Sequence, residues 1–154
     1  MKKYIKALLL ILLILWIQIS FPIKIKDIQV DIFFILIVSF SLTFDIKESI
    51  IMGGISGFLE DLFSGGIIGT FLLLYTITSF FVSYIKRQIN KDYINILIPI
   101  IVFISSFFIY KIGLILYNIL NIKVYSHTEI LKISFANFLF SPLIYLFIYI
   151  IKGE

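Results

Sequence analysis

The segment GFLEDLFSGGIIG, residues 57–69, sets two adjacent carboxylates, Glu60 and Asp61, between glycines and bulky apolar side chains. An ionised carboxylate is inexpensive in water, but it is costly at membrane depth, where it usually has a partner or a function. The meaning of this segment therefore depends on the environment that the rest of the chain creates around it.

The composition predicts an integral membrane protein. Of the 154 residues, 61% are hydrophobic and 14% are charged, whereas globular domains are about 45–50% apolar and about 25% charged. The chain contains no cysteine, which excludes disulfides and thiolate metal sites. The net charge of +4 is dispersed along the chain, so we expect no nucleic-acid partner and expect membrane lipids as the surroundings.

Apolar stretches separated by short polar loops predict a single transmembrane domain over residues 1–154. Backbone that faces lipid must bond within its own helix, so the predicted fold class is all-α, a compact bundle of six transmembrane helices. The expected spans cover about residues 4–23, 30–44, 48–63, 67–85, 93–120 and 130–151.

The first span begins like a signal peptide, with lysines followed by an unbroken apolar run. A cleaved signal ends in small residues, but Trp16, Gln18 and Phe21 occupy that region. Residues 4–23 would cover about 30 Å as a helix, which is a full hydrocarbon thickness. We therefore expect a retained helix, with cleavage as the alternative.

The basic residues predict the orientation. With six spans and a cytoplasmic N-terminus, both termini are cytoplasmic, and eight basic residues lie inside against four outside, in keeping with the positive-inside bias. The inside set is Lys2, Lys3, Lys6, Lys47, Lys86, Arg87, Lys91 and Lys152, and the outside set is Lys24, Lys26, Lys123 and Lys132. The alternative, a re-entrant third stretch, would move the 86–91 cluster outside and fits the charges less well.

One side of the third predicted helix is small and acidic. Gly53, Gly57 and Asp61 follow one another at intervals of four residues, so they share a face. Glycines allow a neighbouring backbone to approach closely, so we expect this face to contact another helix or a water-filled cleft. The bulky residues on the remaining surface are expected to face lipid: Ile51, Met52, Ile55, Phe58, Leu59 and Leu62.

Two further features follow from this face. Ser64, Gly65 and Gly66 should end the helix in a tight turn, after which Gly69 begins the next span of a closely packed hairpin. Lys111 is the candidate ion-pair partner of Asp61, because the two residues should lie at similar depth. The alternative is that Glu60, Asp61 and Lys111 all extend to the headgroup region.

These residues resemble the signature of the rod shape-determining protein MreD family. Gly57, Asp61, Ser64, Gly65 and Gly69 match it, whereas Glu60 stands where the family usually has an apolar residue. The stretch VDIFFILIVSFSL at 30–42 is similar to the family's second span through Asp31, with Val30 in place of a proline. The stretch NFLFSPLIYLFIYII at 137–151 is similar to its closing helix through Asn137, Pro142 and Tyr145.

The resemblance implies a protein of the bacterial inner membrane that takes part in lateral-wall elongation. It implies an MreC-like periplasmic partner and, through that partner, an actin-like filament and the enzymes that build peptidoglycan. It also implies a fold like that of the substrate-binding subunits of energy-coupling-factor transporters. On this basis the expected function is a non-enzymatic scaffold for rod shape determination.

The residues give less support to an enzymatic, transport or ion-conducting function. No nucleophile, base and orienting group can be assembled, so we expect no catalytic, cofactor or metal residues. The tyrosines are expected mainly as interface anchors. The alternative function is a small-solute-binding membrane subunit of a transporter, and a proton or cation pathway through Asp61 and Lys111 ranks below it.

Overall fold

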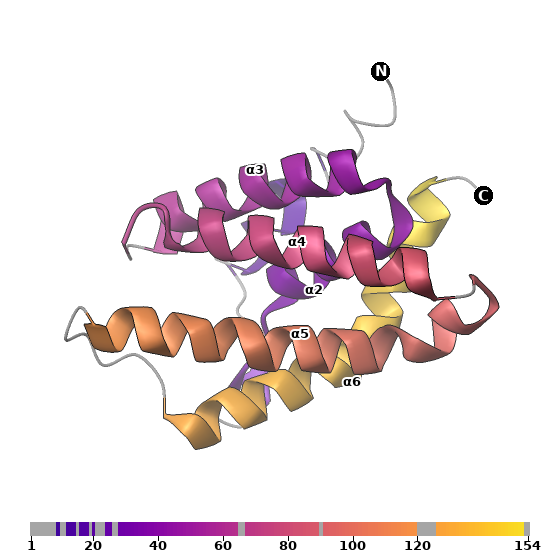
Figure 1. The fold of residues 1–154 in the computed structure, drawn as a ribbon. Coiled ribbons are helices and arrows are strands. Elements are labelled where there is room, and N and C mark those ends of the chain that lie inside the picture. The colour runs from indigo at the N-terminus through magenta and orange to yellow at the C-terminus, as the bar shows by residue number, and fades with distance from the viewer. Residues whose placement is uncertain are drawn as a thin grey trace.

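The computed structural model describes residues 9, 12–14, 16–18, 20, 24–25, 28–64, 67–89, 91–119 and 126–152. Its helices are α2 (Ile32–Thr43), α3 (Ile46–Ser64), α4 (Thr70–Gln88), α5 (Lys91–Ile119) and α6 (His127–Lys152). They lie where the last five apolar stretches predicted helices (Figure 1). Most of the first predicted span, residues 4–23, falls outside the described residues.

A small antiparallel ribbon is the non-helical element of the described chain. Strand β1 (Lys24–Ile25) pairs with β2 (Ile28–Gln29), with Lys24 opposite Gln29 and Ile25 opposite Ile28. The sequence predicted a polar loop here. Apart from this ribbon, the described elements are helices, so the predicted all-α class is confirmed at that level.

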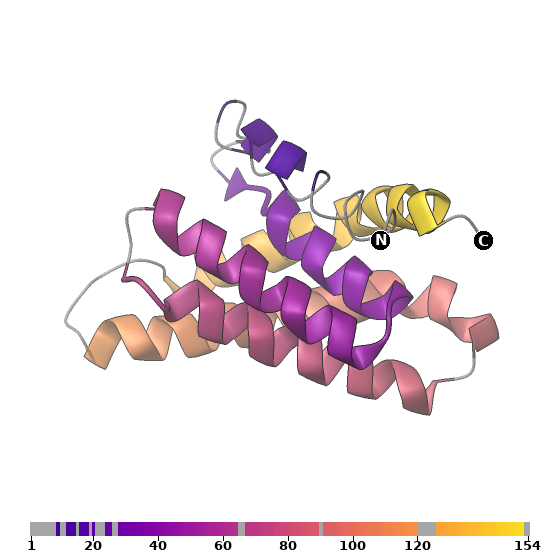
Figure 2. The same cartoon turned by 90° about the horizontal axis from the view of Figure 1, so that it is seen from above.

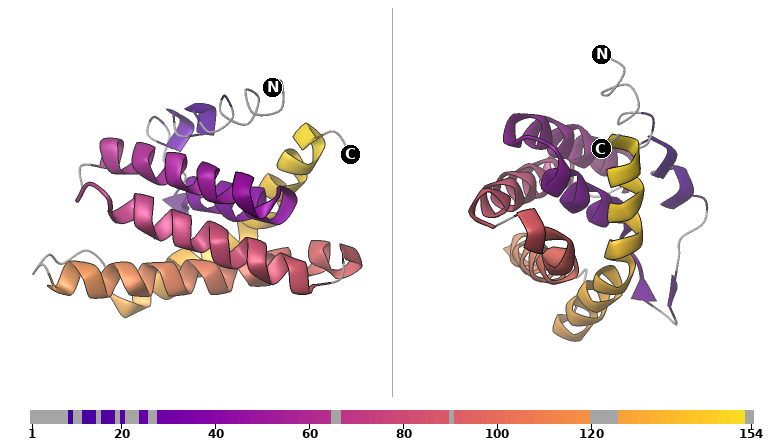
Figure 3. Two further views of the ribbon diagram at one scale, coloured as in Figure 1. Left: turned by 45° about the horizontal axis from the view of Figure 1, so that its top comes forward. Right: turned by 90° about the vertical axis from the view of Figure 1, so that its right-hand side faces the viewer.

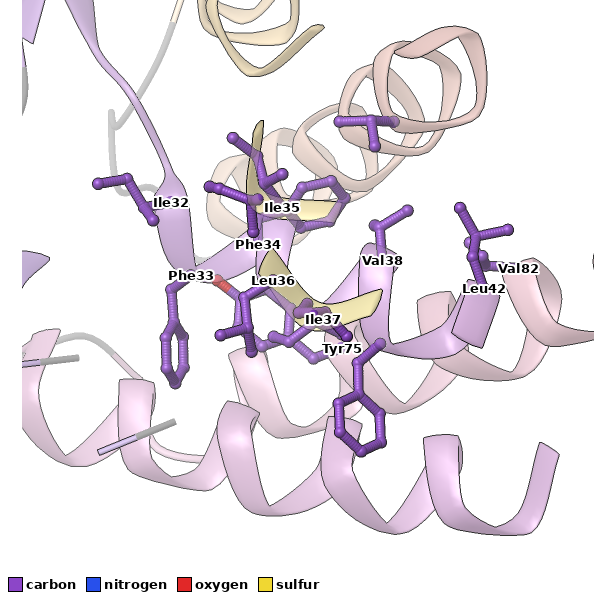
Figure 4. Packing of buried hydrophobic residues seen from close by; sticks show 14 of the residues in the cluster. Ile32, Phe33, Phe34, Ile35, Leu36, Ile37, Val38, Leu42, Tyr75 and Val82 are labelled. Atoms are coloured by element: carbon purple, nitrogen blue, oxygen red, sulfur yellow. The ribbon is translucent and has the colours of Figure 1, made fainter. Parts of the chain in front are cut away.

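Helix α2 forms the centre of the molecule. All of its residues are buried, and its side chains are apolar around most of the helix, which is the pattern of a helix covered on every side (Figure 4). Tyr75 of α4 packs against Phe33 and Phe34, with ring centroids 6.3 and 6.0 Å away. At about 18 Å the 12-residue helix is much shorter than the hydrocarbon core of a bilayer.

Both ends of this buried helix carry a charged partner. The Asp31 carboxylate accepts the N–H of Phe34 at 2.9 Å at the N-terminus. At the other end, Lys86 Nζ donates to the carbonyl of Phe44, the C-cap residue, at 2.8 Å. Each charge has the sign that the helix dipole favours, and each satisfies a group that a helix end leaves without an intrahelical partner.

Two helix pairs surround α2. Helix α3 packs mainly on α4, and α5 packs mainly on α6, while α2 contacts both pairs. Figure 2 and Figure 3 show α3 and α4 together on one side and α5 beside the first half of α6 on the other. The consecutive helices α4 and α5 therefore belong to different pairs.

Helix α6 shows how local chemistry sets its start and its proline. Ser126 and Glu129 form a reciprocal capping box, with Ser126 N donating to Glu129 Oε2 at 2.6 Å and Glu129 N donating to Ser126 Oγ at 3.3 Å. Pro142 lacks an N–H for the carbonyl of Phe138. The hydroxyl of Ser141 donates to that carbonyl instead, at 2.8 Å.

The outer surface is rich in large apolar side chains. Ile51, Ile55, Phe58 and Leu62 of α3 are exposed, as the sequence predicted. The prediction was wrong for Met52, which is 8% exposed and belongs to the core, and for Leu59, which is half-buried against that core, because α3 packs against α2 as well as α4. Within the described residues, two helices are long and apolar enough to cross a membrane, through Leu97–Leu116 and Thr128–Leu146.

Candidate functional site

The small face of α3 lies directly against α4. A Cβ added at Gly57 would meet the carbonyl oxygen of Phe71 and would lie 2.6 Å from the backbone nitrogen of Leu72. At Gly53, an added Cβ would lie 2.7 Å from the carbonyl oxygen of Tyr75 and would meet Ser79. Only glycine fits a backbone approach this close, so the predicted contact of Gly53 and Gly57 with another helix is confirmed.

Asp61, one turn beyond Gly57, caps the next helix. Its carboxylate accepts the backbone N–H groups of Gly69 at 2.8 Å, Phe71 at 2.9 Å and Leu72 at 3.0 Å. These amides belong to the first turn of α4, where N–H groups lack intrahelical acceptors and the helix dipole favours a negative charge. Asp61 is 2% exposed, and its polar contacts account for that burial.

The turn between the two helices depends on Gly69. This N-cap residue of α4 has φ +99°, in the left-handed region that favours glycine. Its conformation places its own N–H and those of Phe71 and Leu72 toward Asp61. Ser64 is the last residue of α3, and Gly65 lies outside the described residues. Gly53 and the signature residues Gly57, Asp61 and Gly69 thus join α3 and α4 into one helical hairpin.

Lys111 and Glu60 complete the residues predicted around Asp61. Lys111 Nζ lies 5.5 Å from the ring centroid of Phe107 on its own helix, a cation–π arrangement. The hydrogen bonds of the Asp61 carboxylate go to backbone amides, so an Asp61–Lys111 ion pair is not needed to explain the burial of Asp61 and stays a prediction. Glu60 is half-buried beside Asp61.

A second polar cluster forms around Asp31. The N–H of Asp31 donates to Asn137 Oδ1 at 3.0 Å, although the two residues are 106 positions apart. Asn137 Nδ2 in turn donates to Ser106 Oγ at 3.0 Å, and the hydroxyl of Tyr110 donates to the Asp31 carboxylate. Gln18 Oε1 accepts the N–H of Phe33 at 2.8 Å.

This Asp31 cluster joins four segments of the chain. It links the N-terminus of α2 to α5, to α6 and to the helical turn that contains Gln18. Asn137 and Ser106 have no exposed surface. A buried network of this kind stabilises one arrangement of the helices when its donors and acceptors are matched. Two of the three stretches that resemble the family signature therefore meet at one point.

Sequence reasoning did not find several members of these clusters. Tyr110 was expected at the membrane interface, but its hydroxyl bonds Asp31, and Tyr75 is 1% exposed in the core. Tyr75 therefore belongs to the core rather than to the outer surface, and the hydroxyl of Tyr110 is directed into the bundle. Gln18 carried a detectable signal, since an amide within an apolar run requires hydrogen-bond partners.

The arrangement supports a structural role more than a chemical one. The carboxylates of Asp31 and Asp61 are both engaged with groups of the protein itself. Among the described residues, no group of three or more His, Cys, Asp or Glu side chains is placed to hold a metal ion.

Comparison with known proteins gives one match. Residues 2–151 match the family model described as rod shape-determining protein MreD. No curated protein and no solved structure matches the chain.

Proposed function

Since the chain belongs to the rod shape-determining protein MreD family, we propose that it is a non-enzymatic scaffold of the bacterial inner membrane. As a member of this family, the chain is a membrane protein that acts in rod shape determination, in the context of the elongasome and peptidoglycan synthesis. The proposed scaffold binds an MreC-like periplasmic protein. Through that protein it would help position an actin-like filament and the wall synthases.

The cap that Asp61 places on α4 carries this proposal. A carboxylate used in catalysis or transport would need to be open to a substrate, whereas Asp61 is almost fully buried and accepts three backbone N–H groups. Those contacts fix Gly69 and the first turn of α4 against the end of α3. A fixed turn of this kind is suited to present a surface to a partner, because a preorganised surface loses little entropy on binding.

The proposed topology has six membrane spans with both termini in the cytoplasm, in a fold like that of the energy-coupling-factor substrate-binding subunits. It is supported by the helices at the predicted positions and by the distribution of basic residues. Cysteines at Ser126 and Gln88, both exposed, test it in this cysteine-free chain with a membrane-impermeant thiol reagent. Labelling from outside is expected at position 126 only, and any other pattern contradicts the topology.

The α3–α4 turn is the proposed contact surface for the periplasmic partner. In the proposed topology it faces the periplasm, and Ile68 is 71% exposed within it. A large apolar side chain on a rigid turn is a suitable anchor for a partner pocket. Helix α5 reaches the same side of the membrane, and its Ile115 is 58% exposed, which makes it a matched control.

Co-purification with the MreC-like partner tests this surface. Ile68→Ser should weaken the complex about tenfold, equivalent to about 1.4 kcal/mol of lost anchor contact. Ile115→Ser should leave the complex within about twofold of the original chain. Equal effects of the two substitutions would contradict the assignment of the turn. Restoration of rod shape in cells that lack their own copy is the functional measurement.

The alternative, a solute-binding transport subunit, receives no comparable support from the described residues. A cavity of about 330 Å³ between α4 and α5 has mostly apolar walls. Binding sites for polar solutes place several polar groups around the ligand.

A further inference from the structure

An apolar groove of about 330 Å³ separates α4 from α5. These helices are consecutive in sequence, but each packs mainly on a different partner (Figure 1). The groove lies between their facing surfaces. The walls consist mainly of large apolar side chains that are also exposed: Ile77, Phe81, Ile85, Ile104, Phe108 and Ile112. The wall also includes Thr78. Its hydroxyl donates to the carbonyl of Leu74 at 2.8 Å, so it is satisfied within its own helix.

The dimensions of the groove favour a narrow occupant. From Ile77 to Ile85 it follows nine residues of α4, a rise of about 12 Å. One leaflet of a bilayer has a hydrocarbon depth of about 15 Å, so the groove matches the length of an acyl chain. A helix of the same length, about 10 Å in diameter, would fill about 900 Å³, so only part of it could lie within this groove.

One end of the groove leads to a cluster of positive charge. Ile85 is followed by Lys86 and Arg87 in the last turn of α4, which ends at Gln88, and α5 begins at Lys91. Arg87 is exposed. Basic residues between membrane helices on the cytoplasmic side favour anionic lipid headgroups, and the topology proposed above places this junction on that side.

We propose that the α4–α5 groove binds one acyl chain of an anionic phospholipid of the cytoplasmic leaflet, with the headgroup beside Lys86 and Arg87 at the end of α4. The chain would fill the space between the two helix pairs, and the headgroup would be held by the cations at the end of the groove. This site rests on the proposed topology and is independent of the contact with the MreC-like partner.

Quenching of a single tryptophan by brominated lipid tests the site. In a Trp16→Phe background, Phe108→Trp places a reporter in the groove wall and Phe135→Trp places one on the exposed face of α6. The two phenylalanines are 61% and 57% exposed, so bulk lipid should reach both equally. The full chain in detergent micelles is titrated with brominated phosphatidylglycerol or with phosphatidylcholine of the same acyl chains.

The reporter at position 108 should reach half-quenching at a phosphatidylglycerol fraction at least about fivefold lower than the reporter at position 135, a ratio equivalent to one headgroup charge contact. Equal titrations would mean contact with bulk lipid only and would overturn the proposal. Shielding of position 108 from both lipids, with position 135 quenched, would mean that a second protein chain fills the groove and would also overturn it. Ile112→Trp serves as a second groove reporter if Phe108→Trp does not fold.

The headgroup assignment has its own control. Arg87→Gln should reduce the preference of position 108 for phosphatidylglycerol over phosphatidylcholine by about fivefold, whereas Lys132→Gln, which removes an exposed charge from α6, should not change it. Equal quenching by the two lipids before any substitution would overturn the anionic specificity. Cysteine labelling opposite to that expected would contradict the topology and, with it, the assignment of the lipid to the cytoplasmic leaflet, whereas loss of the phosphatidylglycerol preference would overturn the groove site itself.

Discussion

The carboxylate of Asp61, in the last turns of α3, accepts the backbone N–H of Gly69 at 2.8 Å. The contact connects the two ends of the α3–α4 turn. It also provides an acceptor for the N–H of Gly69, whose backbone is in the left-handed conformation. Two further amides of α4 share the same carboxylate. The acidic residue of the sequence signature is thus explained by the N–H groups at the start of α4, which lack acceptors within their own helix.

Removal of the Asp61 carboxylate should destabilise the hairpin. Asp61→Ala leaves three N–H groups without their acceptor, and hydrogen bonds to charged groups contribute about 1.5–3 kcal/mol each but are not additive. We expect a loss of about 2–4 kcal/mol, measured by reversible unfolding in detergent. Asp61→Asn should be milder because one side-chain oxygen remains.

Glu60→Ala is the matched control for this prediction. Glu60 is half-buried, and the family signature does not require an acid there, so its loss should have a smaller effect than that of Asp61→Ala. An equal or larger effect of Glu60→Ala would show that general acidity of this face, rather than the cap on α4, stabilises the hairpin.

Gly57 and Gly54 offer a paired test of the helix contact. A Cβ at Gly57 would collide with the backbone of α4, whereas a Cβ at Gly54 would have its nearest neighbour, Thr76 Oγ1, at 3.4 Å. Gly57→Ala should therefore lower the thermal midpoint in detergent and Gly57→Leu should lower it further. Gly54→Ala should be neutral or stabilising by up to about 1 kcal/mol, because alanine favours helix. The reverse order would refute the close contact.

The predicted Asp61–Lys111 pair is tested by a double-mutant cycle. Asp61→Ala and Lys111→Met are combined, and unfolding free energies are compared with those of the single variants. Breaking one partner of a buried pair strands the other charge, so a direct pair predicts a double variant less damaged than the sum of the singles. Additive effects would rule out the pair and leave the α4 cap as the role of Asp61.

Asn137 should be required for the junction of α2 with α6. Asn137→Ala removes the acceptor for the Asp31 N–H and the donor to Ser106, and unsatisfied buried groups cost about 1–3 kcal/mol each. We expect a loss of at least about 2 kcal/mol in detergent unfolding. Asn118→Ala, at an exposed position on α5, should change stability by less than about 0.5 kcal/mol. Similar effects of the two substitutions would contradict a special role for Asn137.

The positions and the class of the helices could be predicted from the sequence alone. Long apolar stretches interrupted by short polar segments allow little besides helices, because backbone hydrogen bonds in an apolar environment must be made locally. The spacing of Gly53, Gly57 and Asp61 likewise determined a small, acidic helix face, because positions four residues apart share a side whatever the fold. These properties depend on residues that are close together in the chain.

The tertiary structure decided which element faces the small, acidic side of α3. It also decided which helix becomes the centre of the molecule. The apolar residues of α2 are compatible with a lipid-facing span, and only the packing of both helix pairs around it shows that all of them are buried. Depth and charge made Lys111 a candidate partner of Asp61, whereas the acceptance of three backbone N–H groups of α4 by this carboxylate is visible only in the folded structure. Backbone N–H donors occur at nearly every residue, so the sequence does not mark the ones that Asp61 binds. Asp31 and Asn137 lie 106 positions apart in the chain. Both contacts therefore form only when folding brings the two partners together.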